Sequence, residues 1–120
     1  MVVDNGSTDD TRERVAAFGD RVRYHYQDNF QGQAGTLNKG FSLARGEVVC
    51  ILDADDLWAP DKLAAVLERF EGEPDLGAVQ HGCRYIDGAG NDLGVESLPH
   101  PGRVTLDDLL AGPVWSSHMS

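Results

Sequence analysis

The sequence of 120 residues has no apolar run of the roughly 18 residues that a membrane-spanning helix needs, and no signal peptide opens it. It is also poor in basic residues, because 10 lysines and arginines stand against 20 acids and give a net charge of -10. Nucleic acids and anionic membranes attract basic surfaces, so neither is expected as the main partner. These absences predict a cytoplasmic protein that binds no nucleic acid, with peripheral docking at the inner face of a membrane as the alternative.

Cysteine is scarce as well. Cys50 and Cys83 stand in apolar surroundings and lack the spacing of metal ligands, so both are predicted to be buried and reduced. The length and the 41% hydrophobic and 25% charged shares are those of an ordinary globular domain, and one domain is predicted over residues 1–120.

Strands and helices are expected to alternate along the chain. Strands are predicted at residues 1–4, 22–26, 48–52 and 77–86, and helices after a cap at Ser7 or Thr8, after the glycine-bearing loop 27–36 as far as Gly46, from Pro60 onward and at 105–112. The run 48–52 is uniformly apolar, as expected of a strand covered on both faces. This alternation predicts an α/β fold, with an open, largely parallel sheet and helices on both faces.

The apolar positions of these elements predict the core. Tyr24 and Tyr26 alternate with polar residues, which is the period of a half-buried strand. In the helix after Pro60, four apolar residues fall at i, i+3, i+4 and i+7, and this face is expected to be buried: Leu63, Val66, Leu67 and Phe70. Residues 87–92 read as a turn that leads into a further extended segment.

Oxygen-rich segments follow two of the predicted strands, at residues 4–7 and 53–56. In an open α/β sheet, ligands bind beyond the carboxyl ends of the strands, so both segments line one crevice if their strands are neighbours. Asp53 and Asp55 project the same way from an extended chain, and convergent carboxylates repel unless a cation lies between them or one binds a proton. Mg²⁺ or Mn²⁺, completed by phosphate oxygens, is the natural cation. Taken singly, each segment also fits a solvated turn or a helix cap.

Three stretches, in this order, carry a combined signal: VVDNGSTDDT, NFQGQAGTLNKGFSLARGE and VVCILDADDLWAPDKL. Together they resemble the family 2 glycosyltransferases of the GT-A (Rossmann-like) fold, closely over residues 1–86 and loosely beyond. The family's middle motif is matched by Asn29, Gly32, Gly35, Asn38 and Gly40, and its third motif by Asp53, Asp55, Asp56 and Pro60.

The resemblance implies a nucleotide-sugar site. Asp4 and Asn5 would meet the base and the ribose, and the acids of the third motif would meet the ribose and hold a metal ion on the diphosphate. The residues implied to bind the nucleotide-sugar are Asp4, Asn5, Gly6, Ser7, Gln33, Gly35, Asn38 and Asp53, and those implied to hold Mg²⁺ or Mn²⁺ are Asp53, Asp55 and Asp56.

The chain departs from the family pattern in several places. Asn5 replaces the commoner second aspartate, and Gln33 stands where many members have lysine. The family's first strand would precede Met1 and its catalytic base would follow Ser120, so the chain is expected to be an incomplete, donor-binding half. No general base is named, because the acids at 107–108 read as the polar face of a helix.

The implied activity is transfer of a sugar from a UDP-, TDP- or GDP-sugar to a hydroxyl of a glycan, lipid-linked or other acceptor. The family favours inversion of configuration and a role in cell-wall or polysaccharide synthesis. A sheet edge left open would allow a homodimer. Two alternatives stay open: a truncated protein that binds nucleotide weakly or not at all, and a receiver-like signalling domain that binds Mg²⁺ through strand-end acids.

Overall fold

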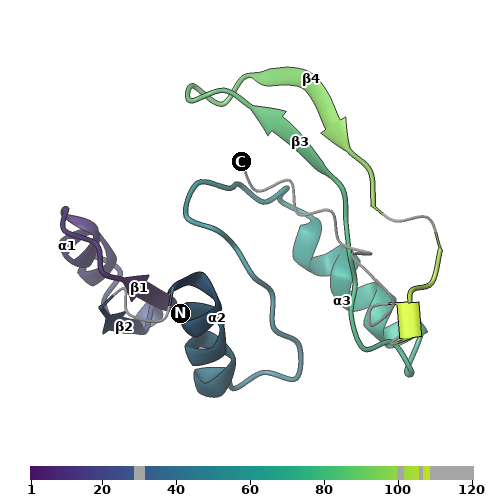
Figure 1. Ribbon diagram of the computed structural model, residues 1–120, viewed down its shortest axis with the longest axis horizontal. Coiled ribbons are helices and arrows are strands. Elements are labelled where there is room, and N and C mark those ends of the chain that lie inside the picture. Colours follow the sequence, from purple (N-terminus) through teal and green to yellow (C-terminus); the bar gives the residue numbers. More distant parts are fainter. Residues whose placement is uncertain (29–31, 100–101, 106, 109–120) are drawn as a thin grey trace. The chain divides into compact units, whose positions relative to one another are not determined.

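Two short sheets carry the fold, one in each of two units of the chain. The structure, a computed structural model drawn in Figure 1, describes residues 1–28, 32–99, 102–105 and 107–108. The chain divides into the units Met1–Trp58 and Ala59–Ser120. A single domain over residues 1–120 stays a prediction.

The first unit contains a parallel strand pair joined by a helical crossover. Strand β1 (Val2–Asn5) pairs with β2 (Tyr24–Gln27), and α1 (Thr11–Ala16) and the 3₁₀ helix η1 (Gly19–Arg21) connect them. Helix α2 (Gly32–Leu43) follows β2 and packs on β1. The predicted alternation of strand and helix is confirmed here, as is the parallel pairing.

The two faces of this sheet are covered by different helices. The register places Val3 opposite His25, so these side chains share one face and Tyr24 projects from the other. A methyl group added at Gly40 of α2 would lie 3.8 Å from Val3 Cγ2, which puts α2 on the Val3 face. The guanidinium of Arg12 in α1 lies 5.6 Å from the Tyr24 ring centroid, which puts α1 on the opposite face. Helices on both faces were predicted, and this unit has them.

The predicted strand at 48–52 is wrong. Residues 48–52 have no strand hydrogen bonding, and Val49, Ile51 and Leu52 are 43%, 47% and 49% exposed. An apolar run becomes a strand only when a neighbouring edge pairs with its backbone groups. The sheet of the first unit has the two strands β1 and β2, and neither pairs with this run. The apolar run therefore has the hydropathy of a buried strand, but no neighbouring strand among the described residues pairs with it.

The predicted core is also more exposed than expected. Within the described residues, no hydrophobic side chain is fully buried. Tyr26 is 51% exposed, and Leu63 and Leu67, on the predicted helix face after Pro60, are each 47% exposed. Cys83 is exposed and Cys50 half-buried, and both are free thiols, so their predicted burial is wrong. Tyr26 lies in a sheet of only two strands, and the helix that carries Leu63 and Leu67 packs closely against no other described helix or strand, so these side chains stay partly exposed.

Helix boundaries differ from those predicted by a few residues. Helix α1 starts after Asp10 rather than at a cap on Ser7 or Thr8, and α2 begins at Gly32, inside the predicted loop, and ends before Gly46. Gly32 has a φ of 60°, and this left-handed conformation turns the chain into the helix. None of the helices in the described part of the chain is long and apolar enough to cross a membrane.

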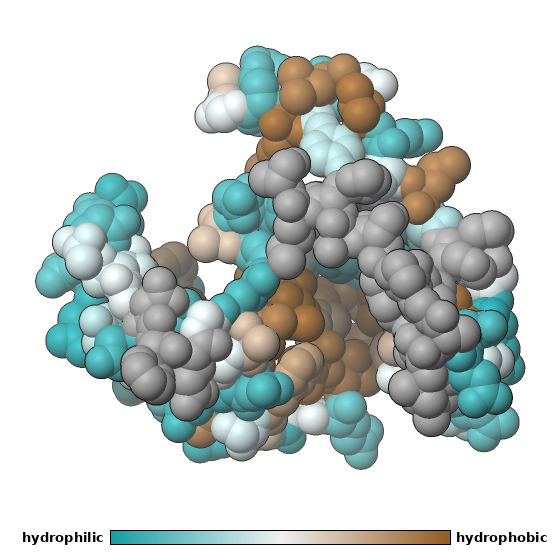
Figure 2. Space-filling view, viewed as in Figure 1, coloured by the Kyte–Doolittle hydropathy of each residue, from teal (hydrophilic) through white to brown (hydrophobic). Residues whose placement is uncertain are grey.

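The second unit consists of a helix and a hairpin. Helix α3 (Lys62–Gly72) starts just after Pro60, as predicted, and β3 (Cys83–Ile86) pairs antiparallel with β4 (Asp92–Ser97). The predicted turn is confirmed, because Asp87 Oδ1 accepts the backbone N–H groups of Ala89 and Asn91 at 2.9 Å each. Figure 2 shows apolar side chains on the visible surface of this hairpin, where Leu93 and Val95 are each 56% exposed.

The predicted helix at 105–112 lies mostly outside the described residues. Of its described part, Asp107 and Asp108 are helical. The backbone N–H of Thr105 donates to Asp108 Oδ2 at 2.8 Å, and that of Asp108 donates to Thr105 Oγ1 at 3.2 Å. This reciprocal pair of hydrogen bonds is a helix cap, and Asp108 stabilises the start of the helix. This agrees with the interpretation of the acids at 107–108 as helix residues rather than as a general base.

Candidate functional site

Asp4 uses both carboxylate oxygens to close the end of β1. Its Oδ1 accepts a hydrogen bond from the backbone N–H of Ser7 at 2.9 Å, and its Oδ2 accepts one from the Tyr24 hydroxyl. Asp4 is only 5% exposed. Burial raises the pKa of this carboxyl, but the hydrogen bonds from Tyr24 and Ser7 and the charge of Arg12 outweigh it, and the pKa lies below its ordinary value. Asp4 is therefore an ionised group that holds the loop after β1 against β2.

Gly6 allows the loop to turn back toward Asp4. Its φ of 85° is in the left-handed region, which side-chain-bearing residues rarely adopt. The turn brings the Ser7 N–H within reach of the Asp4 carboxylate. The predicted loop residues Gly6 and Ser7 thus shape the strand end locally.

A chain of hydrogen bonds links the end of β1 to the first turns of α2. Gln27 Nε2 donates to Asn5 Oδ1 at 3.2 Å and to Thr36 Oγ1 at 2.9 Å. The Thr36 hydroxyl in turn donates to the carbonyl oxygen of Gly32 at 3.1 Å. The parallel register sets Asn5 opposite Gln27, at the carboxyl ends of both strands. The first and second sequence motifs are therefore linked through Gln27, which belongs to neither of them.

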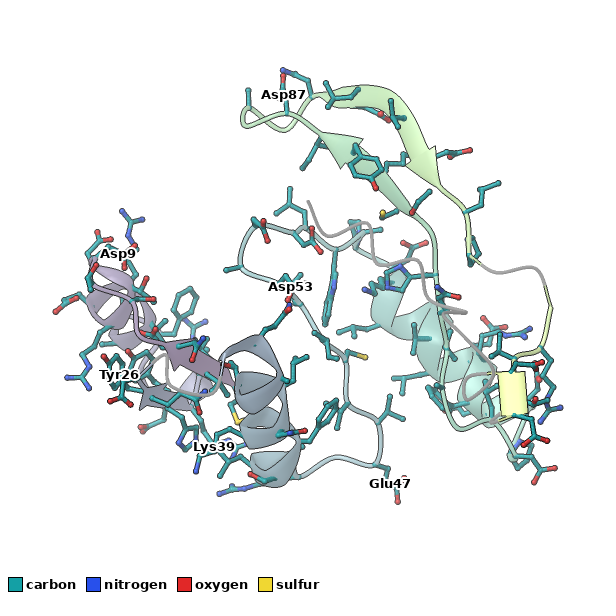
Figure 3. The ribbon with its side chains drawn as sticks, in the orientation of Figure 1. Asp9, Tyr26, Lys39, Glu47, Asp53 and Asp87 are labelled. Carbon is teal, nitrogen blue, oxygen red and sulfur yellow. The ribbon has the colours of Figure 1, made fainter. Side chains whose placement is uncertain are left out.

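An open pocket lies between β2 and α2. Its volume is about 610 Å³, and it is lined by Tyr26, Gln27, Asp28, Gly35, Asn38, Lys39 and Ser42. Figure 3 labels Tyr26 on β2 and Lys39 on α2, from the two elements that form its walls. Two residues predicted to line the nucleotide, Gly35 and Asn38, are part of it. Gln33, the third predicted residue of α2, is exposed and does not line this pocket.

The acids of the third motif lie on the coil that follows α2 in the first unit. Asp53, Asp55 and Asp56 are all exposed, and the backbone N–H of Asp56 donates to the Asp53 carbonyl at 3.2 Å, which closes a turn. Figure 3 shows Asp53 on this coil. Among the described residues, none of the three acids forms an ion pair, and no cluster of three or more histidine, cysteine and acidic side chains is close enough to hold a metal. The third motif is an open acidic turn.

The structure thus joins two of the three predicted motifs and adds residues that the sequence analysis did not assign to the site. Gln27 and Thr36 connect Asn5 to α2, and Tyr24, predicted only as core, holds Asp4. Counting from the ends of the two predicted strands in parallel register would have placed Gln27 beside Asn5. The bond from Tyr24 to Asp4 joins residues 20 apart, and the sequence carries no signal for it.

Comparison with known proteins identifies the family. Residues 1–114 match the glycosyl transferase family 2. The chain belongs to this family. It is 39% identical over 113 residues to an uncharacterized glycosyltransferase of Nostoc sp. strain PCC 7120, which covers 91% of this chain and 34% of that protein. It is 43% identical over 72 residues to the succinoglycan biosynthesis protein ExoO of Rhizobium meliloti, which covers 59% of this chain and 21% of that protein. No solved structure matches this chain.

A third relative has a name that states a reaction. The chain is 36% identical over 64 residues to the UDP-Glc:alpha-D-GlcNAc-diphosphoundecaprenol beta-1,3-glucosyltransferase WfgD of Escherichia coli, which covers 52% of this chain and 25% of that protein. This chain spans about a third of the first of these relatives and less of the other two. Membership in the family confirms the predicted GT-A α/β fold and the glycosyltransferase resemblance, and it decides against a receiver-like signalling domain.

Proposed function

We propose that this protein is a glycosyltransferase in which residues 1–58 bind a nucleoside-diphosphate sugar. The observation that supports this most is the junction of the first two motifs, where Gln27 binds both Asn5 and Thr36 at the carboxyl ends of parallel strands. Ligands of open α/β sheets bind at such ends. UDP-sugars are the first donors to test, because the name of the relative WfgD states UDP-glucose. TDP- and GDP-sugars are the next.

The acceptor in this proposal is a hydroxyl of a glycan or of a lipid-linked saccharide, in line with the names of ExoO and WfgD. In an inverting transfer, the acceptor oxygen attacks the anomeric carbon as the bond from that carbon to the diphosphate breaks. The acceptor proton passes to a general base, a role that we assign to none of the described residues. Peripheral docking at a membrane and pairing of two chains through a sheet edge stay predictions.

The acidic turn at 53–56 has the chemistry of a divalent-cation site. Its carboxylates are hard oxygen ligands, they are exposed, and they carry no ion pair among the described residues. We propose that Asp53 and Asp55 hold Mg²⁺ or Mn²⁺ and that Asp56 supports them. Such an ion would neutralise the charge that develops on the leaving diphosphate. The contribution of the protein to such a site is a group of neighbouring carboxylates, whose mutual repulsion a bound cation would relieve.

Calorimetric titration of UDP into the chain, with Mn²⁺ and then with EDTA, tests both parts of the proposal. Binding that requires Mn²⁺ and weakens at least about tenfold in Asp55→Ala would support both the donor site and the metal site. A tenfold change corresponds to about 1.4 kcal/mol in the free energy of binding. Asp75→Ala is the matched control, because Asp75 is an exposed acid of the second unit. Binding unaffected by EDTA and by Asp55→Ala would contradict the metal site alone. No heat with UDP, TDP or GDP would contradict the donor site and favour the alternative of a protein that binds no nucleotide.

A further inference from the structure

The hydrogen bonds around Gln27 have a fixed direction. The Thr36 hydroxyl has one hydrogen, and it donates this hydrogen to the carbonyl oxygen of Gly32 at 3.1 Å. Its oxygen can then only accept from Gln27, so the Gln27 atom at 2.9 Å must be the nitrogen Nε2 and not the oxygen Oε1. A carbonyl oxygen of the helix backbone therefore sets the orientation of the Gln27 carboxamide.

The same nitrogen sets the orientation of Asn5. Gln27 Nε2 carries two hydrogens and lies 3.2 Å from the Asn5 side chain, so the Asn5 atom that faces it must be the acceptor Oδ1. The Asn5 carboxamide is thereby held with its oxygen turned toward β2 and its nitrogen at the other end. An aspartate would be indifferent to this constraint, because its two oxygens are alike. With asparagine, the two ends are a donor and an acceptor, and the orientation decides which is which.

We propose that Gln27 is a specificity-determining residue, which selects the nucleobase by fixing the orientation of the Asn5 carboxamide through the relay Gly32–Thr36–Gln27–Asn5. This inference rests on the proposed function and on the role that the family resemblance implies for Asp4 and Asn5, which together would meet the base and the ribose; the inference assigns the base to Asn5. Gln27 acts through Asn5 and is a positioning residue. Nothing in the proposal requires Gln27 itself to touch the ligand.

Uridine and cytidine nucleotides are the probes that separate the two orientations. Uracil has a donor at ring position 3 and an acceptor at position 4, whereas cytosine has an acceptor at position 3 and a donor at position 4. Their diphosphates carry the same charge, so any effect of added charge on the protein cancels in the ratio of the two dissociation constants. A reversed Asn5 carboxamide must change this ratio.

Gln27→Glu reverses the relay with little change of shape. A carboxylate at position 27 only accepts, so Thr36 must turn its hydrogen away from Gly32 and Asn5 must turn its nitrogen toward position 27. Titration of UDP and CDP in the presence of Mn²⁺ should then show a ratio of dissociation constants changed at least about tenfold from wild type. Thr36→Val removes the hydroxyl and should also change the ratio of dissociation constants. Thr36→Ser keeps the hydroxyl and should have the wild-type ratio. Thermal melting of each variant checks the fold.

A second measurement needs no nucleotide. In the free protein, the side-chain amide NMR signals of Asn5 should shift in Gln27→Glu and Thr36→Val and stay in place in Thr36→Ser. If the wild type binds nucleotide and folded Gln27→Glu shows the same ratio of the UDP and CDP dissociation constants, this inference is overturned and the proposed function stays intact. Unmoved Asn5 signals in Gln27→Glu would overturn it as well. A wild type that binds neither UDP nor CDP but whose Asn5 signals shift in the variants would overturn the proposed choice of nucleotide, and the selectivity role with it.

Discussion

Replacing Asp4 by asparagine tests the role that the structure gives to the most buried acid of the site. Asparagine has the same shape and can keep both contacts, since its Oδ1 can accept from the Ser7 N–H and its Nδ2 can donate to the Tyr24 oxygen. What it loses is the charge. A hydrogen bond to a charged group contributes about 1.5–3 kcal/mol and a neutral one about 0.5–1.5 kcal/mol, so two such bonds predict a loss of about 2 kcal/mol in the free energy of unfolding at pH 7.

The pH dependence separates this charge effect from a packing effect. The pKa of Asp4 in the folded protein is lower than its ordinary value, so the unfolded chain takes up its proton first as the pH falls. The stabilisation by the Asp4 carboxylate is therefore complete well above about pH 4 and is lost as the pH falls through the folded pKa. Below that pH both proteins carry a neutral group at position 4, and their stabilities should converge.

Urea denaturation followed by circular dichroism, at pH 7 and at acid pH, measures the difference between wild type and Asp4→Asn. Asp20→Asn is the control for removing one negative charge, because Asp20 is exposed. Its stability should stay within about 0.5 kcal/mol of wild type. The reasoning fails if Asp4→Asn is as stable as wild type at pH 7, or if its deficit persists unchanged at acid pH.

Further predictions concern other parts of the two units. His25 Nε2 is buried and has no hydrogen-bond partner among the described residues, so His25→Phe should raise the free energy of unfolding by about 1 kcal/mol, measured by chemical denaturation. Gly6→Ala should lower it by about 1–2 kcal/mol because of the φ of 85°, whereas Gly88→Ala, with open space around it and no positive φ, should not; equal effects would count against the loop strain. Asp87→Ala removes the acceptor for two backbone N–H groups of the hairpin turn, and their hydrogen exchange should become faster, with unchanged exchange as the contrary result.

Much of the first unit was predictable from local patterns. The β-branched start of the chain, the capping region before α1 and the alternation around Tyr24 predicted a strand, a helix and a strand, and a crossover of this length favours parallel pairing. The turn at 87–92 was predictable for a related reason, because Asp87 binds backbone groups only two to four residues away. Interactions of such short range depend only on neighbouring residues, so the local sequence is enough to predict them.

The run at 48–52 shows where a local pattern is insufficient. Hydropathy states that Val49 and Ile51 favour burial, but it does not supply the strand edge that would pair with them. The same reasoning applies to α3, whose apolar face was correctly placed on a helix and yet has Leu63 and Leu67 half exposed. Burial depends on what packs against an element, and that is a property of the whole unit.

The sequence by itself determined the order of the three motifs, and with it the family and the candidate nucleotide-binding and acidic residues. The tertiary structure decided how these residues are used. Asp4, which the resemblance placed at the nucleotide, has both oxygens occupied by Ser7 and Tyr24, whereas Gln27, which no motif included, orients Asn5. The reason is physical. A hydrogen bond depends on distance and direction between atoms, and the partners of Asp4 and Asn5 on β2 lie 20 and 22 residues away, brought within reach only when the two strands pair.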